Sequence, residues 1–240
     1  MKNFAFTLAE ILITLGIIAV VAALTIPSMI TNIKNQGFAE KFKKTYSALQ
    51  QAKMSIESET GFSFKDYQHC GNGSIENCVY LGKLFAQHLN TIDDYFAPDK
   101  PYKYYSSVYE SYKPYKMLNG NSNNYWYYFN VMNSYILHLN DGTIIYFRVR
   151  GIDYSLNVYN YSKTIFCIDV NGLEKPNQMG RDVFVVWLSN DGKLSVTESV
   201  PGVSDGTLYY NNDCDPKASD IGGYGISCAY RIITEGKMNY

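Results

Sequence analysis

The sequence has no marked excess of charge of either sign, and it lacks the common catalytic motifs. Its 240 residues include 21 Lys or Arg and 22 Asp or Glu, for a net charge of −1. A nearly neutral chain lacks the basic surface that nucleic-acid binding requires, so we expect no nucleic acid as the main partner. There is no phosphate-binding loop, no nucleophile elbow and no His-rich zinc motif. We therefore expect the protein not to be an enzyme.

Histidine and cysteine are sparse, and their spacings do not match a zinc site. The three histidines are His69, His88 and His138, and the five cysteines are Cys70, Cys78, Cys167, Cys214 and Cys228. Local pairing would join Cys70 to Cys78 and Cys214 to Cys228 around two Gly-containing loops. Cys167 would then remain as a buried thiol in an apolar strand. Other pairings stay open, because spacing alone does not determine disulfide connectivity.

Charge is also missing near the N-terminus, where residues 11–33 contain no charged side chain. About 20 consecutive apolar residues cross a bilayer core of about 30 Å, so this run is long enough to span a membrane. One carboxylate, that of Glu10, lies at the start of the run. Because a carboxylate near hydrocarbon is costly, it usually has a partner or a function. The simpler alternative is a membrane anchor with Glu10 at headgroup level.

The order Ala5-Phe-Thr-Leu-Ala-Glu10, then the apolar run, then Pro27 resembles the N-terminus of type IV pilins and type II secretion pseudopilins. In that family a prepilin peptidase cuts on the cytoplasmic side of the apolar run and methylates the new N-terminus. The resemblance implies cleavage between Ala5 and Phe6, with N-methylation of Phe6. Ala5 stands where the family usually has Gly. Glu10 and Pro27 match the family's glutamate and its helix-bending proline.

Physical reasoning gives Glu10 and Pro27 roles in assembly. The Glu10 carboxylate of one subunit can pair with the α-amino group of Phe6 on a neighbour, so its charge is compensated only when subunits stack. Pro27 has no N–H, so the carbonyl of Ala23 loses its helical partner and the helix can bend there. The implied partners are prepilin peptidase, other pilin-like subunits, the assembly platform and the inner membrane.

The resemblance also implies a location and a function. The chain would cross the inner membrane once, with a cytoplasmic N-terminus, as Lys2 indicates, and a head in the periplasm or outside the cell. It would then be built into a type II secretion pseudopilus or a type IV pilus. The alternative is a secreted or membrane-anchored soluble domain with an enzymatic or carbohydrate-binding role. A signal-peptidase site at Val21-Ala22-Ala23 would fit a secreted protein, but Glu10 interrupts the apolar region.

Apolar residues continue at helical spacing beyond Pro27 as far as Ile56, and Gly61 is a helix stop signal. The pattern predicts a leader at 1–5 and a long helix at 6–59, transmembrane over 6–30 and amphipathic over 31–59. A globular head would occupy 60–240. The predicted fold class is α+β and pilin-like, with the long helix packed on an antiparallel β-sheet.

Within the head, the sequence predicts a second helix and five strands. The helix covers 79–89, and the strands cover 134–139, 143–149, 164–170, 183–189 and 193–197. Asn140-Asp-Gly142 and Asn190-Asp-Gly192 are hairpin turn signals. The last segment, 226–234, fits either a strand or a short helix. Most of the 23 Tyr lie between Tyr95 and Tyr161, where they could pack the sheet or form a carbohydrate-binding or subunit-contact surface.

One loop carries side chains that could bind calcium, and no other cofactor is expected. The candidate ligands are Asp169, Asn171, Glu174 and Asp182. Calcium prefers several closely spaced oxygen ligands, although this spacing does not fit an EF-hand. The alternative is a turn in which Asn171-Gly172 adopts positive φ and Asp169 accepts hydrogen bonds from nearby amides.

Overall fold

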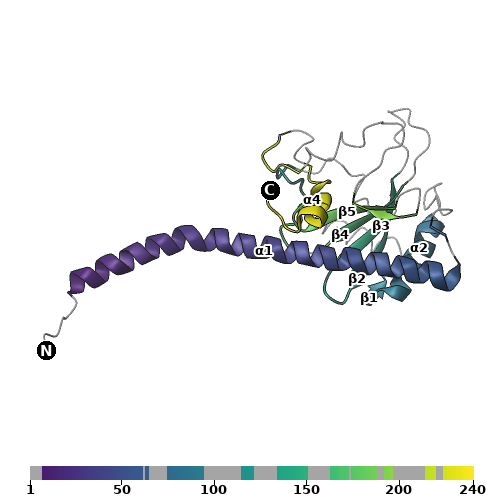
Figure 1. Ribbon diagram of the computed structural model, residues 1–240, viewed down its shortest axis with the longest axis horizontal. Helices are drawn as coiled ribbons and strands as arrows, with labels where there is room; N and C mark the ends of the chain where they lie inside the picture. Colours follow the sequence, from purple (N-terminus) through teal and green to yellow (C-terminus); the bar gives the residue numbers. More distant parts are fainter. Residues whose placement is uncertain are drawn as a thin grey trace, which may run out of the picture. The chain divides into compact units, whose positions relative to one another are not determined.

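The computed structural model of the chain (Figure 1) describes ten stretches of the sequence. They are residues 7–61, 63–64, 75–94, 115–121, 134–150, 163–172, 174–188, 192–196, 214–219 and 224–240. The chain divides into two compact units, Met1–Gly37 and Phe38–Tyr240. Helix α1 (Leu8–Thr60) runs through both, so its two parts are described with the unit to which each belongs.

The part of α1 in the first unit is apolar on its surface. Every Leu, Ile, Val and Met side chain from Leu8 to Ile33 is exposed, the least exposed being Ile11 at 44%. Pro27 lies inside the helix, which continues past it. By length and composition α1 is long and apolar enough to cross a membrane. The described structure thus agrees with an apolar N-terminal helix, as the sequence predicts.

The part of α1 in the second unit is buried along one side. Its buried residues are Ala39, Phe42, Thr45, Leu49, Ala52 and Ile56. They recur every three or four residues, which is the spacing of a helix with one face in a core. At the end of the helix, Gly61 has φ of 66° and its N–H donates to the carbonyl of Glu57 at 3.1 Å. Gly61 is therefore the left-handed cap that the sequence predicts.

The head contains an antiparallel sheet whose described strands follow one another in sequence order. They are β1 (Thr91–Asp94), β2 (Ser134–Leu139), β3 (Ile144–Arg150), β4 (Lys163–Asp169), β5 (Val183–Leu188) and β6 (Leu194–Ser195). Each strand pairs antiparallel with the next. The five predicted strands correspond to β2–β6. Strand β1 was not predicted, because it has only four residues, Thr-Ile-Asp-Asp, and two of them are Asp, which is depleted in strands.

Both faces of the sheet are covered. On one face, Phe147, Phe166 and Phe184 share a core with α1 and with α2 (Ile75–His88). On the other face, Tyr146, Cys167 and Trp187 form a second cluster with neighbouring loop residues. All six residues of β5 are buried. A strand covered on both faces is a continuous apolar run rather than an alternating one, which explains the sequence Val-Phe-Val-Val-Trp-Leu.

The last segment forms helix α4 (Cys228–Glu235), so the helical alternative is correct. Ala229 and Ile232 of α4 join the same core as α1 and the sheet. Gly236 ends the helix in the left-handed conformation, with φ of 80°, and its N–H donates to the carbonyl of Ile232. The second unit is therefore an α+β head in which helices pack on an antiparallel sheet.

Candidate functional site

The N-terminal candidate site is built around Thr7 and Glu10. The Thr7 N–H and its hydroxyl donate to Glu10 Oε2 at 2.8 and 2.9 Å, and the Glu10 N–H donates to Thr7 Oγ1 at 3.2 Å. This reciprocal arrangement is a capping box, which satisfies backbone donors at the start of a helix. Glu10 therefore has a partner within its own chain. The Thr-x-x-Glu pattern before the apolar run is the sequence signal for this role of Thr7.

Pro27 lies in a part of α1 that is rich in hydroxyl side chains. Thr25 Oγ1 donates to the carbonyl of Val21, Ser28 Oγ to that of Thr25, and Thr31 Oγ1 to that of Pro27, each at 2.9 Å. Such bonds to the preceding turn often accompany bends in helices. They satisfy the hydroxyl hydrogens without a partner outside the helix. The predicted cleavage residues, Ala5 and Phe6, lie outside the described residues.

Two of the four predicted calcium ligands are buried acids that bond to protein groups. Tyr115 donates its hydroxyl to Asp169 Oδ2 at 2.5 Å. Burial raises the pKa of Asp169 to about 8, and the neighbouring charge of Asp182 acts in the same direction. Burial also raises the pKa of Asp182, whose carboxylate accepts the N–H groups of Asn177 and Gln178 at 2.7 and 2.6 Å.

The other two predicted ligands, Asn171 and Glu174, differ in their surroundings. Asn171 Nδ2 donates to the carbonyls of Glu174 and Lys175 at 2.9 and 3.2 Å, while Asn171 Oδ1 is buried without a hydrogen-bond partner. Glu174 is exposed. In the described part of the chain, no three His, Cys, Asp or Glu side chains lie together as a metal would need. Gly172 has φ of 67°, which is the turn geometry of the alternative interpretation.

Lys41 is a further residue that no sequence pattern identified. It lies on α1 in the head, and its Nζ donates to the carbonyls of Asp141 and Val170 at 2.8 and 2.7 Å. These carbonyls belong to two separate turns, one after β2 and one after β4. Lys44 adds an ion pair to the Asp141 side chain at 3.3 Å. The two lysines thus join α1 to the turns at one end of the sheet.

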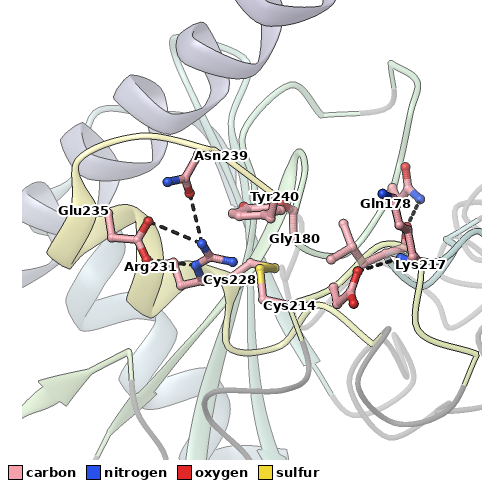
Figure 2. Close-up of a disulfide and its surroundings, with 11 residues drawn as sticks. Gln178, Gly180, Cys214, Lys217, Cys228, Arg231, Glu235, Asn239 and Tyr240 are labelled. Atoms are coloured by element: carbon pink, nitrogen blue, oxygen red, sulfur yellow. Dashed lines mark hydrogen bonds and ion pairs between the residues drawn. A yellow bond between two sulfur atoms is a disulfide. The ribbon is translucent and has the colours of Figure 1, made fainter.

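The C-terminal segment is held by the predicted Cys214–Cys228 disulfide, which the structure contains (Figure 2). Beside it, Tyr240 donates its hydroxyl to the carbonyl of Gly180 at 2.5 Å. Arg231 bonds to Glu235 and Asn239 on the same side of the segment. The predicted Cys70–Cys78 pair lies outside the residues whose side chains are described, and Cys167 is a buried thiol, as expected.

The described residues thus offer an exposed apolar helix with one carboxylate at its start, and a head whose buried acids bond to protein groups. The comparisons with protein families, with curated proteins and with solved structures found no match for the chain.

Proposed function

We propose that the chain is a pilin-like structural subunit. It is cleaved by prepilin peptidase between Ala5 and Phe6, methylated at Phe6 and assembled into a type II secretion pseudopilus or a type IV pilus. Before assembly the subunit crosses the inner membrane once, with its N-terminus in the cytoplasm and its head in the periplasm or outside the cell. It has no catalytic activity of its own.

The observation that carries the proposal is the exposed apolar part of α1. The large apolar side chains from Leu8 to Ile33 all lie on the surface of the isolated chain. An apolar surface of this length needs either lipid or other apolar helices around it. A filament subunit has both surroundings in succession: lipid while it is in the membrane, and the apolar helices of other subunits once it is in the filament core.

The rest of α1 supports the same proposal. The helix continues from the apolar part to Thr60 and contributes Phe42, Leu49 and Ile56 to the core of the head. Lys41 and Lys44 tie it further to the turns of the sheet. One continuous helix therefore carries both the apolar segment and core residues of the head. A structural subunit requires such a continuous helix, because a force applied to the head must be transmitted to the segment that anchors it.

Mapping the N-terminus of the mature protein tests the proposal. The full-length chain would be produced together with a prepilin peptidase and analysed by intact mass and N-terminal peptide mapping. We expect the mature chain to begin at Phe6 and to carry one N-methyl group. Ala5→Leu is the matched control and should remain uncleaved, because the small residue before the cut is lost. A mature start at Leu24 would instead indicate a secreted protein and would remove the pilin proposal.

A further inference from the structure

The segment that follows α4 returns to the Cys214–Cys228 disulfide (Figure 2). Gly236, with φ of 80°, ends α4 in the left-handed conformation and turns the chain. Four residues later, the ring of Tyr240 packs against Leu118 and both cysteines of the disulfide. We call residues 236–240 the lid.

The disulfide is covered from more than one side. Cys214 is 4% exposed and Cys228 is fully buried. The backbone of Gly180 also lies against the disulfide, because a Cβ atom added at Gly180 would be 2.6 Å from Cys228 Sγ. Disulfide exchange begins when a thiolate attacks one of the two sulfur atoms, so it depends on access to them. With the lid closed, a thiol in solution has no such access.

The start of the lid is held by α1 and by the core of the head. Lys43 of α1 donates from Nζ to the carbonyl of Gly236 at 2.5 Å. Met238, two residues further along, packs against the core that α1 shares with the sheet. These contacts fix the direction in which the chain leaves α4.

The end of the lid is held by Arg231 of α4. Its Nη2 donates to Asn239 Oδ1 at 3.1 Å, and its guanidinium carbon lies 5.3 Å from the centre of the Tyr240 ring. A guanidinium over an aromatic ring is attracted to it. Glu235 holds the guanidinium in place by accepting the Nε hydrogen at 2.9 Å. The Tyr240 hydroxyl adds its hydrogen bond to the carbonyl of Gly180.

Side chains alone make these contacts. Among the described residues, no backbone–backbone hydrogen bond joins residues 237–240 to another part of the chain. Opening of the lid therefore leaves α4 and the sheet intact, and such segments open at a lower free-energy cost than the whole domain unfolds. We propose that the lid controls the access of thiols to the Cys214–Cys228 disulfide, which reacts with them only when the lid is open. This role goes beyond the proposed function and does not depend on it.

The reaction through the open lid is exchange with a dithiol. One thiolate of the reagent attacks a sulfur atom and forms a mixed disulfide, and the other cysteine leaves as a thiolate. The second thiolate of the reagent then closes the reagent's own disulfide and releases the first cysteine, so the reagent is oxidised and the protein is reduced. The chain has five cysteines, so pairing within it leaves at least one thiol. A closed lid prevents exchange of the Cys214–Cys228 bond with such thiols.

Reduction of the folded chain by dithiothreitol tests the proposal. The full chain in detergent would be treated without denaturant, quenched at intervals with N-ethylmaleimide and analysed by peptide mapping for alkylated Cys214 and Cys228. Tyr240→Ala removes the ring from the lid, whereas Tyr240→Phe keeps the ring and loses the hydroxyl. Tyr230→Ala is the matched control, because Tyr230 also belongs to this segment, on α4, but is 36% exposed.

We expect the disulfide of Tyr240→Ala to be reduced about tenfold faster than that of the parent, which corresponds to lid closure weakened by about 1.4 kcal/mol. The rate for Tyr240→Phe should lie between the two, and Tyr230→Ala should react at the parent's rate. Urea at concentrations below the unfolding transition should change the parent's rate little, because opening of the lid exposes little surface.

Three results would overturn the proposal: reduction of Tyr240→Ala no faster than that of the parent, equal acceleration in Tyr230→Ala and Tyr240→Ala, or a parent rate that rises with urea in step with the unfolded fraction. The last result would show that the disulfide reacts only through global unfolding. None of these results bears on cleavage before Phe6, so the proposed function is judged separately by the mature N-terminus.

Discussion

Gly82 of α2 lies directly against Tyr135 of β2. A Cβ atom added there would lie 2.1 Å from the ring of Tyr135, which is fully buried. We expect Gly82→Ala to lower the free energy of unfolding by about 1–3 kcal/mol, because an overpacked core must shift. The measurement is denaturant unfolding of the full chain in detergent.

Gly37→Ala is the matched control for this substitution. Gly37 also lies inside a helix, and a Cβ atom there would meet nothing within 4 Å. It should stabilise the helix by about 0.5–1 kcal/mol, because alanine loses less backbone entropy than glycine. Equal changes in the free energy of unfolding for the two substitutions would show that overpacking against Tyr135 does not destabilise the head.

Asp169 should make the head less stable as the pH rises. Burial raises its folded-state pKa to about 8, whereas an unfolded aspartate titrates near about 3.9. The folded state therefore binds more protons between these values, and the free energy of unfolding falls as pH rises from about 4 to about 8. One group contributes a slope of at most about 1.4 kcal/mol per pH unit. Burial of Asp182 acts in the same direction.

Asp169→Asn isolates the contribution of Asp169 to the pH dependence of stability from the contributions of the other titrating groups. An asparagine oxygen can still accept the hydrogen bond from Tyr115, but the side chain no longer titrates. Unfolding measured at several pH values should show a shallower decline for the variant than for the parent. A parent whose stability rises steadily over this pH range would contradict the assignment of a neutral, buried Asp169.

Among the structural elements, the C-terminal segment is closed by a covalent link. The disulfide joins Cys214 to Cys228 across a sequence separation of 14, and it anchors the first residue of α4. Replacing both cysteines by serine should lower the free energy of unfolding by about 2–4 kcal/mol, as expected for a loop of this length. Non-reducing peptide mapping should recover this bond, with Cys167 alkylated only after unfolding. A bond that includes Cys167 would show the pairing to be wrong.

The loop between β4 and β5 is the element to examine for calcium. We expect chelation to leave the melting temperature of the chain unchanged, because Asp169 is bonded to Tyr115 and Asp182 to two backbone amides. The measurement is thermal unfolding with and without EDTA. A lower melting temperature in EDTA, with the difference abolished in Asp169→Ala, would instead establish a calcium site at this loop.

At the scale of the whole molecule, the proposed function depends on Glu10. In an assembled filament its carboxylate would neutralise the α-amino group of Phe6 on a neighbouring subunit. We expect Glu10→Leu to insert, to be cleaved and to fold, yet to be absent from sheared filaments. Glu10→Asp should be intermediate, because the charge remains but the side chain is shorter. The measurement is the amount of each variant in membranes and in filaments.

Glu10→Gln distinguishes two roles of Glu10: its charge, which would pair with an amine in the filament, and its hydrogen bonds in the capping box. Glutamine can accept the same hydrogen bonds from Thr7, so the start of the helix should be unchanged. The variant should nevertheless fail to assemble, because it cannot neutralise an amine. Filaments formed equally well by Glu10→Gln would show that Glu10 acts as a helix cap and not as an assembly charge.

The features that could be predicted from the sequence are local ones. An apolar run, followed by apolar spacing of three or four residues, predicted a long helix at 6–59, which is close to α1 at Leu8–Thr60, and Gly61 marked its end. Asn140-Asp-Gly142 marked the turn between β2 and β3. The sequence also singled out the Cys214–Cys228 pair, which the structure contains. These predictions succeed because turn chemistry and side-chain periodicity act over a few residues.

The remaining features were decided by contacts between residues distant in the sequence. Tyr115 reaches Asp169 across 54 residues, and Lys41 reaches Val170 across 129 residues. No local spacing encodes such pairs, since they form only when the sheet brings separate turns and loops together. The same holds for β1, whose two Asp residues disfavour a strand and which forms by pairing with β2. Tertiary packing also made a helix of the last segment, by giving Ala229 and Ile232 a place in the core.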